Sequence, residues 1–552
     1  MKRLNSVKFS AAMEVCALIT SGIATGICFW PGNYGWMFWF VFVPLFWIIL
    51  KKDWKAAFFK GWLFGIFAWL SGIYWFIPPL LKFLGIHFAA ALPLLLVFFA
   101  WHGLMFAILA GAASALSDYF LKRMGWRKEI TVLWVAAPAM AAVERFFPML
   151  FPVYFANTQY FHLPQVQILE VFGPAGLLWL ILGFNAAAYL LAKALWERKF
   201  EPIPGAPRGL YSALAIFGAF CGLISLNEYY GALRIRQIDA LVKTETARGH
   251  SISVSIIQGS GKVEDAETLG VYRRLTAEAL KTTDTDMVIW PESVYDRTAE
   301  YGISRDSSGE KSVFSSDFAR TLKAEVPYKT TMLMGAKGRF TDKSGRPQPQ
   351  SALKRNIAFI TGPGRELLGL TEKRYLFPFG EFIPLGAIFP RLYRIFPYSD
   401  DISPGAISAP LNFAKGKAGV VICYEDLYTE ASRRFSSKGA NILFNITNEA
   451  RFGYTMSPEQ HLNLSALRAI ENRRFFVRAV NTGISAVIDP AGRVVRRLAV
   501  KERGSITTKI QLMEYRTFYS THGDFLCFFG ILLVSFFVFL AMIKSPGDTR
   551  LL

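Results

Sequence analysis

Long apolar runs flanked by lysine and arginine fill most of the first 227 residues of the chain, and one more such run lies near its end. No charged side chain occurs from Val15 to Leu50, and Pro31-Gly32 interrupts that run, which predicts two helices joined by a tight turn. The last run contains 19 uncharged residues and would extend about 28 Å as a helix, enough to cross a hydrocarbon core. The pattern therefore predicts a membrane-embedded helical bundle of about eight spans. The remaining runs lie at about 56–77, 88–116, 130–143, 166–192, 209–227 and 525–543.

The distribution of lysine and arginine predicts how these spans are oriented in the membrane. Under an eight-span arrangement, nearly all flanking lysines and arginines fall on the side of the two termini, whereas Lys82 and Arg145 fall on the opposite side. Because basic loops stay in the cytoplasm, both termini are predicted to be cytoplasmic and the long polar segment to lie outside. We therefore expect a seven-span bundle over 1–227, an extracytoplasmic domain over 228–522, and an eighth helix with a short cytoplasmic tail over 523–552.

The long polar segment has a different pattern, in which short apolar runs rich in β-branched residues alternate with helical stretches. Such alternation is typical of an α/β sandwich whose sheets are covered by helices. The predicted strands lie at 252–257, 287–290, 331–335, 357–361, 418–423, 442–446, 476–480 and 484–488, and the predicted helices at 264–281, 316–324 and 459–473.

Composition narrows the class of protein. With 53% hydrophobic and 18% charged residues, the chain is too apolar for an ordinary soluble protein. Its formal net charge of +20 gathers at the ends of apolar runs, where anionic lipid headgroups are the expected counter-charge, so a nucleic-acid partner is not expected. Four of the five cysteines lie in apolar runs, which excludes a disulfide framework in the polar segment.

Three residues whose side chains could take part in catalysis lie near the ends of apolar, strand-like runs. Glu292 ends the run Met287 to Glu292, Lys373 precedes an aromatic-rich segment, and Cys423 ends the apolar run that begins at Ala418. A thiol needs a base to become a nucleophile near neutral pH, and a neighbouring carboxylate such as Glu292 suits that role. Lys373 and the backbone N–H after Cys423 would stabilise the oxyanion that forms when a thiolate attacks an acyl group.

Each of these residues also has an ordinary structural interpretation. A cysteine that ends an apolar strand is usually a packing residue. Glu292 can be a solvated carboxylate after a proline-terminated strand, and Lys373 can belong to an exposed charge run with Arg374. The spacing of the three residues does not by itself decide between structure and chemistry.

Longer motifs carry a family resemblance that favours chemistry. Trp290-Pro291-Glu292, Lys373 and Cys423-Tyr424-Glu425 resemble the Glu, Lys and Cys motifs of the nitrilase superfamily. The full chain resembles the membrane-embedded branch of that superfamily, the apolipoprotein N-acyltransferases, most specifically in the string from Pro378 to Leu385 that follows the lysine. The runs 445–453, 460–461, 468–471 and 481–488 also resemble that branch.

The resemblance implies an α-β-β-α sandwich on the periplasmic side of a bacterial inner membrane. It implies transfer of an acyl chain from a phospholipid to the α-amino group of the S-diacylglyceryl cysteine of an apolipoprotein, through a thioester on Cys423. It further implies Glu292 as the base, Lys373 on the tetrahedral intermediate, and Glu381, Tyr424 and Glu425 as supporting residues.

An apolar stretch with spaced arginines follows this motif, from residue 382 to residue 396. We expect it to dip into the membrane interface and admit acyl chains, with its arginines near lipid phosphates. A buried connector between core strands is the alternative interpretation. The residues expected to face lipid are Phe382, Ile383, Leu385, Phe389, Arg391 and Arg394.

Two departures from the family pattern bear on the acceptor. Gln258-Gly259-Ser260 continues without the tryptophan that usually follows, and Arg451 stands where the family has an aromatic residue. A membrane-tethered amidase or nitrilase-type hydrolase, or an acyltransferase with another amine acceptor, therefore remains open. A transporter or receptor is a further alternative, although the spans contain few ionisable groups.

No cofactor is expected. The six histidines have no metal-ligand spacing with one another or with Cys423, and no phosphate-binding loop or dinucleotide fingerprint follows a strand. We therefore expect no metal and no nucleotide, and a monomer with lipid and lipoprotein partners.

Overall fold

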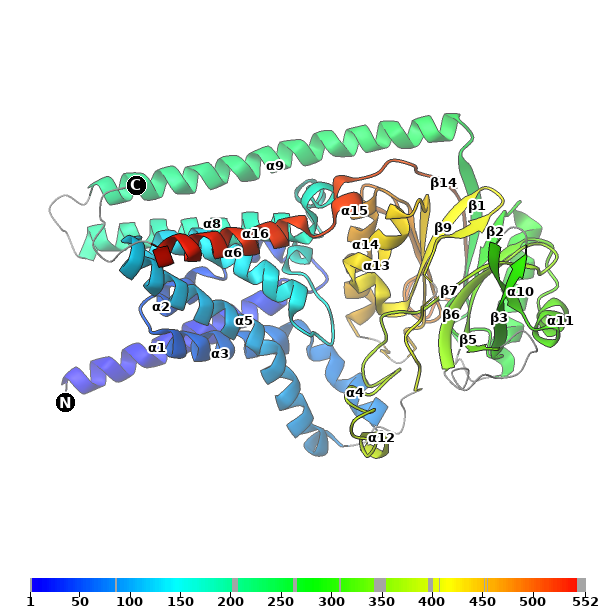
Figure 1. Ribbon diagram of the computed structural model, residues 1–552, viewed down its shortest axis with the longest axis horizontal. Coiled ribbons are helices and arrows are strands. Elements are labelled where there is room, and N and C mark those ends of the chain that lie inside the picture. The colour runs from blue at the N-terminus through cyan, green and yellow to red at the C-terminus, as the bar shows by residue number, and fades with distance from the viewer. Residues whose placement is uncertain are drawn as a thin grey trace. The chain divides into compact units, whose positions relative to one another are not determined.

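The computed structural model describes residues 2–84, 87–200, 207–261, 266–306, 309–341, 354–395, 401–406, 408–450, 452–453 and 455–543. The chain forms two compact units (Figure 1). The helical unit comprises Met1–Ile77, Ile86–Arg234 and Asp524–Leu552, and the sandwich unit comprises Pro78–Gly85 and Ile235–Gly523. The domain boundaries at 227/228 and 522/523 stay a prediction, and the compact units divide at 234/235 and 523/524.

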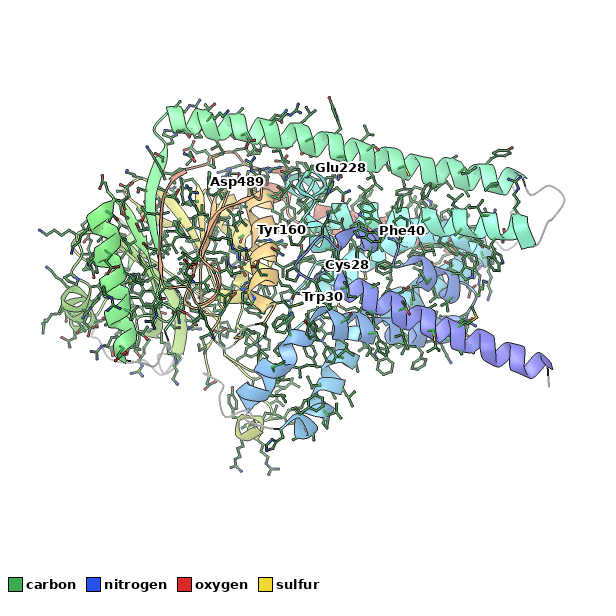
Figure 2. The ribbon with its side chains drawn as sticks, turned by 180° about the vertical axis from the view of Figure 1, so that it is seen from behind. Cys28, Trp30, Phe40, Tyr160, Glu228 and Asp489 are labelled. Atoms are coloured by element: carbon green, nitrogen blue, oxygen red, sulfur yellow. The ribbon has the colours of Figure 1, made fainter. Side chains whose placement is uncertain are left out.

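The helical unit is built from apolar helices that pack through small residues and aromatic rings. At Gly61 an added Cβ would lie 2.4 Å from the carbonyl oxygen of Phe106, so only glycine lets α3 and α5 approach this closely. Trp30, just after α1, donates its indole N–H to the carbonyl oxygen of Ser71 at 2.8 Å (Figure 2). The helices of this unit are α1 (Lys2–Ile27), η1 (Gly35–Trp39), α2 (Val43–Ile49), α3 (Trp54–Gly72), η2 (Tyr74–Phe76), α5 (Phe88–Met124), α6 (Lys128–Phe146), η3 (Phe155–Gln159), α7 (Leu163–Val166), α8 (Leu169–Phe200), most of α9 (Pro207–Ala247) and α16 (Phe525–Ile543).

Among the described residues, four helices are long and apolar enough to cross a membrane, namely α5, α8, α9 and α16. A fifth is added if α3 and the helical segment after it, bent by 61°, count as one broken span. The predicted spans nearest the N-terminus coincide with shorter apolar helices, Ala11–Ile27 and Gly35–Ile49. The protein is therefore a membrane protein with several apolar spans, and the count of eight stays a prediction.

Two β-sheets form the centre of the sandwich unit. The first has the order β14-β1-β2-β5-β3-β4, with β6 paired to β5 and β7 paired to β6, and the second has the order β13-β12-β11-β10-β9-β8. In the first sheet β1, β2 and β5 run parallel, and in the second β9, β10 and β11 do, so each group presents its carboxyl ends at one edge. The strands are β1 (Ser251–Gln258), β2 (Met287–Ile289), β3 (Ala299–Asp306), β4 (Gly309–Phe314), β5 (Thr331–Phe340), β6 (Lys354–Thr361), β7 (Leu367–Glu372), β8 (Leu411–Phe413), β9 (Gly416–Ile422), β10 (Ile442–Thr447), β11 (Phe476–Val480), β12 (Ala486–Ile488), β13 (Val494–Arg497) and β14 (Gly504–Gln511).

The two sheets pack face to face, and helices cover their outer faces. One apolar core joins inner-face residues of both sheets, such as Ile256 and Leu333 with Val420 and Phe444. A second core lies on the outer face of the first sheet, where α10 and α11 pack, while α13 and α14 pack on the second sheet. The layers confirm the predicted α/β sandwich. The helices of this unit are α4 (Ile77–Leu84), α10 (Ala266–Thr282), α11 (Ser316–Glu325), α12 (Leu392–Ile395), η5 (Cys423–Leu427), α13 (Thr429–Ser437), α14 (Ser457–Asn472) and α15 (Phe518–His522).

Candidate active site

Cys423 stands at a sharp turn where β9 ends. The predicted strand included Cys423, but β9 ends one residue earlier at Ile422, and Cys423 begins the short helix η5. Its φ of 55° is left-handed, a conformation that non-glycine residues rarely adopt and that often marks functional turns. The side-chain amide of Asn445 donates to the carbonyl oxygen of Cys423 at 2.8 Å and fixes this turn. The thiol is thereby presented, partly buried, at the carboxyl edge of the second sheet.

Glu292 lies at the corresponding edge of the first sheet, three residues after β2, and it is buried. Its Oε2 accepts a hydrogen bond from the backbone N–H of Asn448 at 3.1 Å. Its Oε1 accepts one from the side-chain amide of Asn356 at 2.7 Å and faces the ammonium of Lys373 at 3.4 Å. Three donors from three segments therefore hold a buried carboxylate in one orientation.

Lys373 follows β7 directly and is almost completely buried, with 1% of its surface exposed. Its Nζ lies 2.8 Å from Oε1 of Glu381 and 3.4 Å from Oε1 of Glu292. Burial by itself lowers the pKa of Lys373, but the charges of the two carboxylates outweigh it and hold the pKa well above its usual value. The site therefore contains a fixed buried cation.

Glu381 and Asn356 complete the polar core of the site. Glu381 accepts the backbone N–H of Phe377 at 2.8 Å through Oε2, and the Asn356 amide at 2.9 Å through Oε1. Asn356 therefore donates to both carboxylates at once, a role that the sequence analysis missed. Its polar side chain directly before the apolar strand pattern of 357–361 was the available signal, because a buried polar side chain must be hydrogen-bonded.

Glu425 and Tyr424, which follow Cys423, form hydrogen bonds with the backbone of the segment after Lys373. Glu425 Oε1 accepts the backbone N–H groups of Arg374 and Tyr375 at 2.7 and 3.0 Å, and its Oε2 accepts that of Ile422 at 2.8 Å. Burial raises the pKa of Glu425 to about 7 despite these donors. The Tyr424 hydroxyl donates to the carbonyl oxygen of Leu376 at 2.8 Å. Both side chains therefore join the Cys423 turn to the Lys373 segment.

The surroundings of Cys423 keep its thiol protonated at rest. Burial raises the pKa of the thiol, the negative charges of Glu292 and Glu381 raise it further, and Lys373 opposes them. The Thr447 hydroxyl, one residue after the pair formed by Ile446 and Ile422, also acts to lower the pKa of the thiol, although its oxygen is not within hydrogen-bonding geometry of any described residue. A neutral thiol beside a held carboxylate and a fixed cation is suited to attack with concurrent proton transfer.

Comparison with known proteins shows which family this chain resembles. Residues 253–519 match the carbon–nitrogen hydrolase family, and residues 21–187 match the apolipoprotein N-acyltransferase N-terminal domain. An apolipoprotein N-acyltransferase of Geobacter metallireducens is 27% identical over 95% of this chain and 94% of its own length. The chain belongs to the apolipoprotein N-acyltransferase family. It is thus an acyltransferase of the nitrilase superfamily, as the motifs predicted.

Two further relatives extend the comparison. An apolipoprotein N-acyltransferase of Rhodopseudomonas palustris is 24% identical over 97% of this chain and 96% of its own length. The crystal structure of Saccharomyces cerevisiae Nit3, a nitrilase-superfamily member, is 17% identical with a TM-score of 0.35, covering 55% of this chain and 97% of that one. The α/β sandwich of this chain follows from its own sheet order and packing.

The apolar stretch expected to face lipid in this family member is mostly exposed. Leu385 and Phe389 are 62% and 57% exposed, and the neighbouring Ile388 is 68% exposed. Arg391 and Arg394, beside and within α12, are also exposed. These side chains form one surface of apolar residues with flanking positive charge, which we name the exposed loop.

Two of the residues predicted to face lipid, Ile383 and Phe382, are not fully exposed. Ile383 is buried, with 3% of its surface exposed, so its assignment to the lipid-facing surface is wrong. Ile383 follows a tight turn, in which the backbone N–H of Phe379 donates to the carbonyl oxygen of Phe382 at 2.7 Å. Phe382 is itself only partly exposed.

The departures from the family pattern are only partly within the described residues. Ser260 adopts a left-handed φ of 51°, and its backbone N–H donates to the carbonyl oxygen of Asn481 at 3.0 Å. Arg451 lies outside the described residues. The structure therefore places the first departure in an ordered turn after β1 and leaves the second untested.

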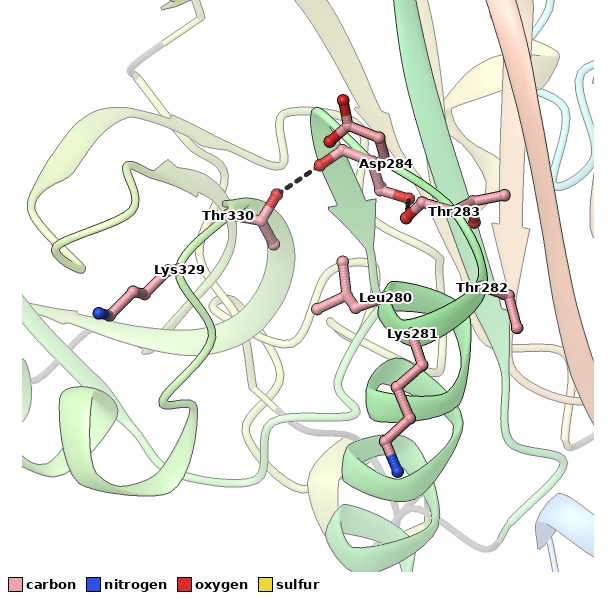
Figure 3. A pocket seen from close by; sticks show the side chains of 8 residues that line it. Leu280, Lys281, Thr282, Thr283, Asp284, Lys329 and Thr330 are labelled. Atoms are coloured by element: carbon pink, nitrogen blue, oxygen red, sulfur yellow. Dashed lines mark hydrogen bonds between the residues drawn. The ribbon is translucent and has the colours of Figure 1, made fainter.

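A separate hollow of about 460 Å³ opens where α10 leads into β2 (Figure 3). Lys281, Asp284 and Lys329 are among its lining residues, and the Thr330 hydroxyl donates to the carbonyl oxygen of Thr285 at 2.9 Å. It lies before the start of β2, whereas Glu292 follows the end of that strand, so the hollow belongs to the opposite edge of the sheet. Over the described ranges, no group of three or more His, Cys, Asp or Glu side chains is arranged to hold a metal ion.

Proposed function

We propose that the protein transfers an acyl chain from a membrane phospholipid to the α-amino group of the S-diacylglyceryl cysteine of apolipoproteins. Cys423 carries the chain as a thioester between the two half-reactions. The observation that carries the proposal is the convergence of Glu292, Lys373 and Glu381 in one hydrogen-bonded group, within a chain that has apolar spans and belongs to this family.

In the first half-reaction, Glu292 accepts the thiol proton as the sulfur of Cys423 attacks an ester carbonyl carbon of the phospholipid. The negative charge that develops on the carbonyl oxygen is stabilised by the ammonium of Lys373 and the backbone N–H of Tyr424. Collapse of the tetrahedral intermediate breaks the ester C–O bond, and the departing lysophospholipid oxygen takes the proton from Glu292. The products are a thioester and a lysophospholipid.

In the second half-reaction, the α-amino group of the acceptor attacks the thioester carbonyl. The same cation and N–H stabilise the second oxyanion, and Glu292 accepts the proton that the amine loses. The C–S bond breaks, the proton returns to the sulfur of Cys423, and the product is an amide on the acceptor cysteine. The enzyme is then restored.

The exposed loop supports a lipid donor. Its apolar side chains would enter the acyl-chain boundary of a bilayer, while Arg391 and Arg394 would lie near lipid phosphates. The distribution of basic residues around the spans supports eight spans, cytoplasmic termini and a periplasmic sandwich unit in the inner membrane of a bacterium. The functional unit in this proposal is a monomer that uses no cofactor.

Intact mass spectrometry of the full-length protein tests the proposal. Exposure to phosphatidylethanolamine vesicles should add one acyl chain to Cys423, and a diacylglyceryl-cysteine peptide should remove it and become N-acylated. Cys423→Ala should form neither product, whereas Cys16→Ala should form both, because Cys16 is an exposed residue of α1. Retained transfer in Cys423→Ala would overturn the thioester route.

The same measurement separates the alternatives. Rapid loss of the acyl chain to water, with no amide product, would favour a membrane-tethered amidase or hydrolase. Discharge by simple amines in preference to the peptide would favour a different amine acceptor. The departure at Ser260 makes this comparison informative, because it lies on the acceptor-related motif that differs from the family.

A further inference from the structure

Four charged side chains contact one another inside the sandwich unit, close in sequence and space to the turn that carries Cys423. His461 of α14 lies between two carboxylates, with its Nε2 2.6 Å from Oδ1 of Asp426 and its Nδ1 2.6 Å from Oε1 of Glu449. Arg478 of β11 bridges the same carboxylates, 2.7 Å from Oδ2 of Asp426 and 3.2 Å from Oε1 of Glu449. The hydroxyl of Ser465 donates to Oδ2 of Asp426 at 2.6 Å. We name Asp426, Glu449, His461 and Arg478 the buried cluster.

The hydrogen-bond geometry fixes the charge of His461. An ionised carboxylate only accepts hydrogen bonds, and each ring nitrogen lies 2.6 Å from a carboxylate oxygen, so with Asp426 and Glu449 ionised both nitrogens carry protons and the imidazole is a cation. With His461 charged, two cations balance two anions. Because Asp426 and Arg478 are fully buried and Glu449 is 3% exposed, an unbalanced charge here would be strongly unfavourable.

The buried cluster connects the two halves of the catalytic site. Asp426 belongs to η5, three residues after Cys423, so its position sets the position of the nucleophile turn. Glu449 directly follows Asn448, whose backbone N–H donates to Oε2 of Glu292. His461 joins Asp426 to Glu449 and therefore joins the nucleophile turn to the segment that orients the base.

Gly483 provides the space that the Glu449 carboxylate occupies. At Gly483 an added Cβ would lie 1.8 Å from Oε2 of Glu449, so only glycine leaves space for the carboxylate. Glu449 is thus enclosed from both sides, by His461 with Arg478 and by the backbone at Gly483.

We propose that the buried cluster is a positioning device for the acyl transfer, in which a doubly protonated His461 holds the Cys423 turn and the Glu292 segment in register. The proposal rests on the proposed function. Its residues touch neither substrate nor the reacting atoms, and they act through the two loops that they join.

The proposal has a pH signature. Burial lowers the pKa of His461, as does Arg478, but Asp426 and Glu449 outweigh them and raise the pKa above its usual value. As the pH rises through this raised pKa, His461 loses a proton, one of its nitrogens stops donating, and the cluster gains a net negative charge. The acylation rate should therefore fall on the alkaline side.

The test is single-turnover acylation of Cys423 in the full-length protein, followed by intact mass spectrometry with phosphatidylethanolamine vesicles from about pH 6 to about pH 10. His461→Gln should lower the rate constant about 10- to 100-fold, as expected for misplaced reacting groups, and should abolish the alkaline fall that depends on His461. The lipid concentration at half-saturation should stay unchanged, because the cluster does not bind lipid. His250→Gln is the matched control, because His250 also faces a buried carboxylate, Glu245 at 2.8 Å, without any link to Cys423.

A wild-type rate and pH profile in His461→Gln would overturn the proposal. Should that variant not fold, Glu449→Gln provides the second test, since it removes one negative neighbour and should move the alkaline fall to lower pH. An unmoved fall would also overturn the proposal. If the wild-type protein forms no acyl-enzyme, the proposed function fails instead, and the alkylation rate of Cys423 by chloroacetamide over the same pH range still tests the cluster.

Discussion

Lys373 is paired most closely with Glu381, whose Oε1 lies 2.8 Å from the lysine Nζ. The lysine is 3.4 Å from Glu292, so the carboxylate assigned as the base is not the one that chiefly holds the cation. This division matters because a base whose charge were fully neutralised by Lys373 would take a proton from the thiol less readily. Glu381 therefore forms the closer ion pair with Lys373, and Glu292 remains available to accept the thiol proton.

Replacing Glu381 tests this division. Glu381→Gln removes the closer negative charge and one acceptor of the Lys373 ammonium, so we expect the pKa of Lys373 to fall and its position to loosen. The rate constant for acylation of Cys423 should drop about 100- to 1,000-fold, as for loss of an oxyanion-stabilising group. Glu366→Gln, which changes an exposed carboxylate in a turn, should leave the rate unchanged. Equal rates in the two variants would contradict the assignment.

Thr447 offers a test of how the thiol is tuned. Because its hydroxyl acts to lower the pKa of Cys423, Thr447→Val should shift the alkylation of Cys423 toward higher pH. The alkylation rate at a given pH should fall about tenfold, which corresponds to one hydrogen bond to a charged group. Thr447→Ser keeps the hydroxyl and should resemble the wild type. Peptide mass spectrometry after chloroacetamide treatment measures this, and identical pH profiles for the valine and serine variants would rule the contact out.

Glu425 predicts a pH-dependent stability. Its pKa is raised from 4.5 to about 7 in the folded protein, so the stability that it contributes is present below about pH 4.5 and is lost as the pH rises to about 7. Glu425→Gln does not titrate. The melting temperature of the wild type should therefore fall relative to that of Glu425→Gln between these two pH values, and the difference should stay constant above them. A difference that does not change between these pH values would show that Glu425 is already ionised there.

The exposed loop predicts a donor-dependent defect. Ile388→Glu with Phe389→Glu places two charges where apolar side chains would enter the bilayer, so acylation from phospholipid vesicles should fall about tenfold or more. Acylation from a soluble short-chain ester should be unaffected, because the catalytic group is unchanged. Val313→Glu is the control, since Val313 is an exposed apolar residue of β4 at 43%. Equal losses with both donors would show that the loop supports the fold rather than the lipid.

The strands that the sequence predicted and those that it missed differ in their place in the sheets. Continuous apolar runs such as 252–257 and 442–446 became central strands that are buried on both faces. Six of the strands that the structure describes were not predicted from the sequence. Five of them are edges, where one side of the strand meets solvent and polar side chains are tolerated, namely β4, β7, β8, β13 and β14, whereas the sixth, β3, lies between β5 and β4. In β13, for example, two of four residues are arginines. An edge strand lacks the apolar continuity on which the prediction depended.

The candidate site was predicted only in part, for a similar reason. Glu292, Lys373 and Cys423 were visible because each adjoins a pattern that the sequence displays, and family motifs surround them. Asn356 and His461 act through partners that are 64 and 35 residues away along the chain. Their contribution exists only once both sheets and α14 are packed, so a local pattern can mark the polar side chain but cannot identify its partners.

The end of α9 has a practical consequence for anyone who wishes to study the sandwich unit in isolation. Within that unit Ile238 is fully buried, Leu241 packs against the core between the sheets, and Asp239 pairs with Arg493. A truncated protein beginning at β1 would expose this apolar patch and remove one of the two carboxylates that pair with Arg493, and it would be prone to aggregate. A crystallisable soluble fragment must therefore start at or before Ile238, 13 residues upstream of the first residue of β1 and within α9.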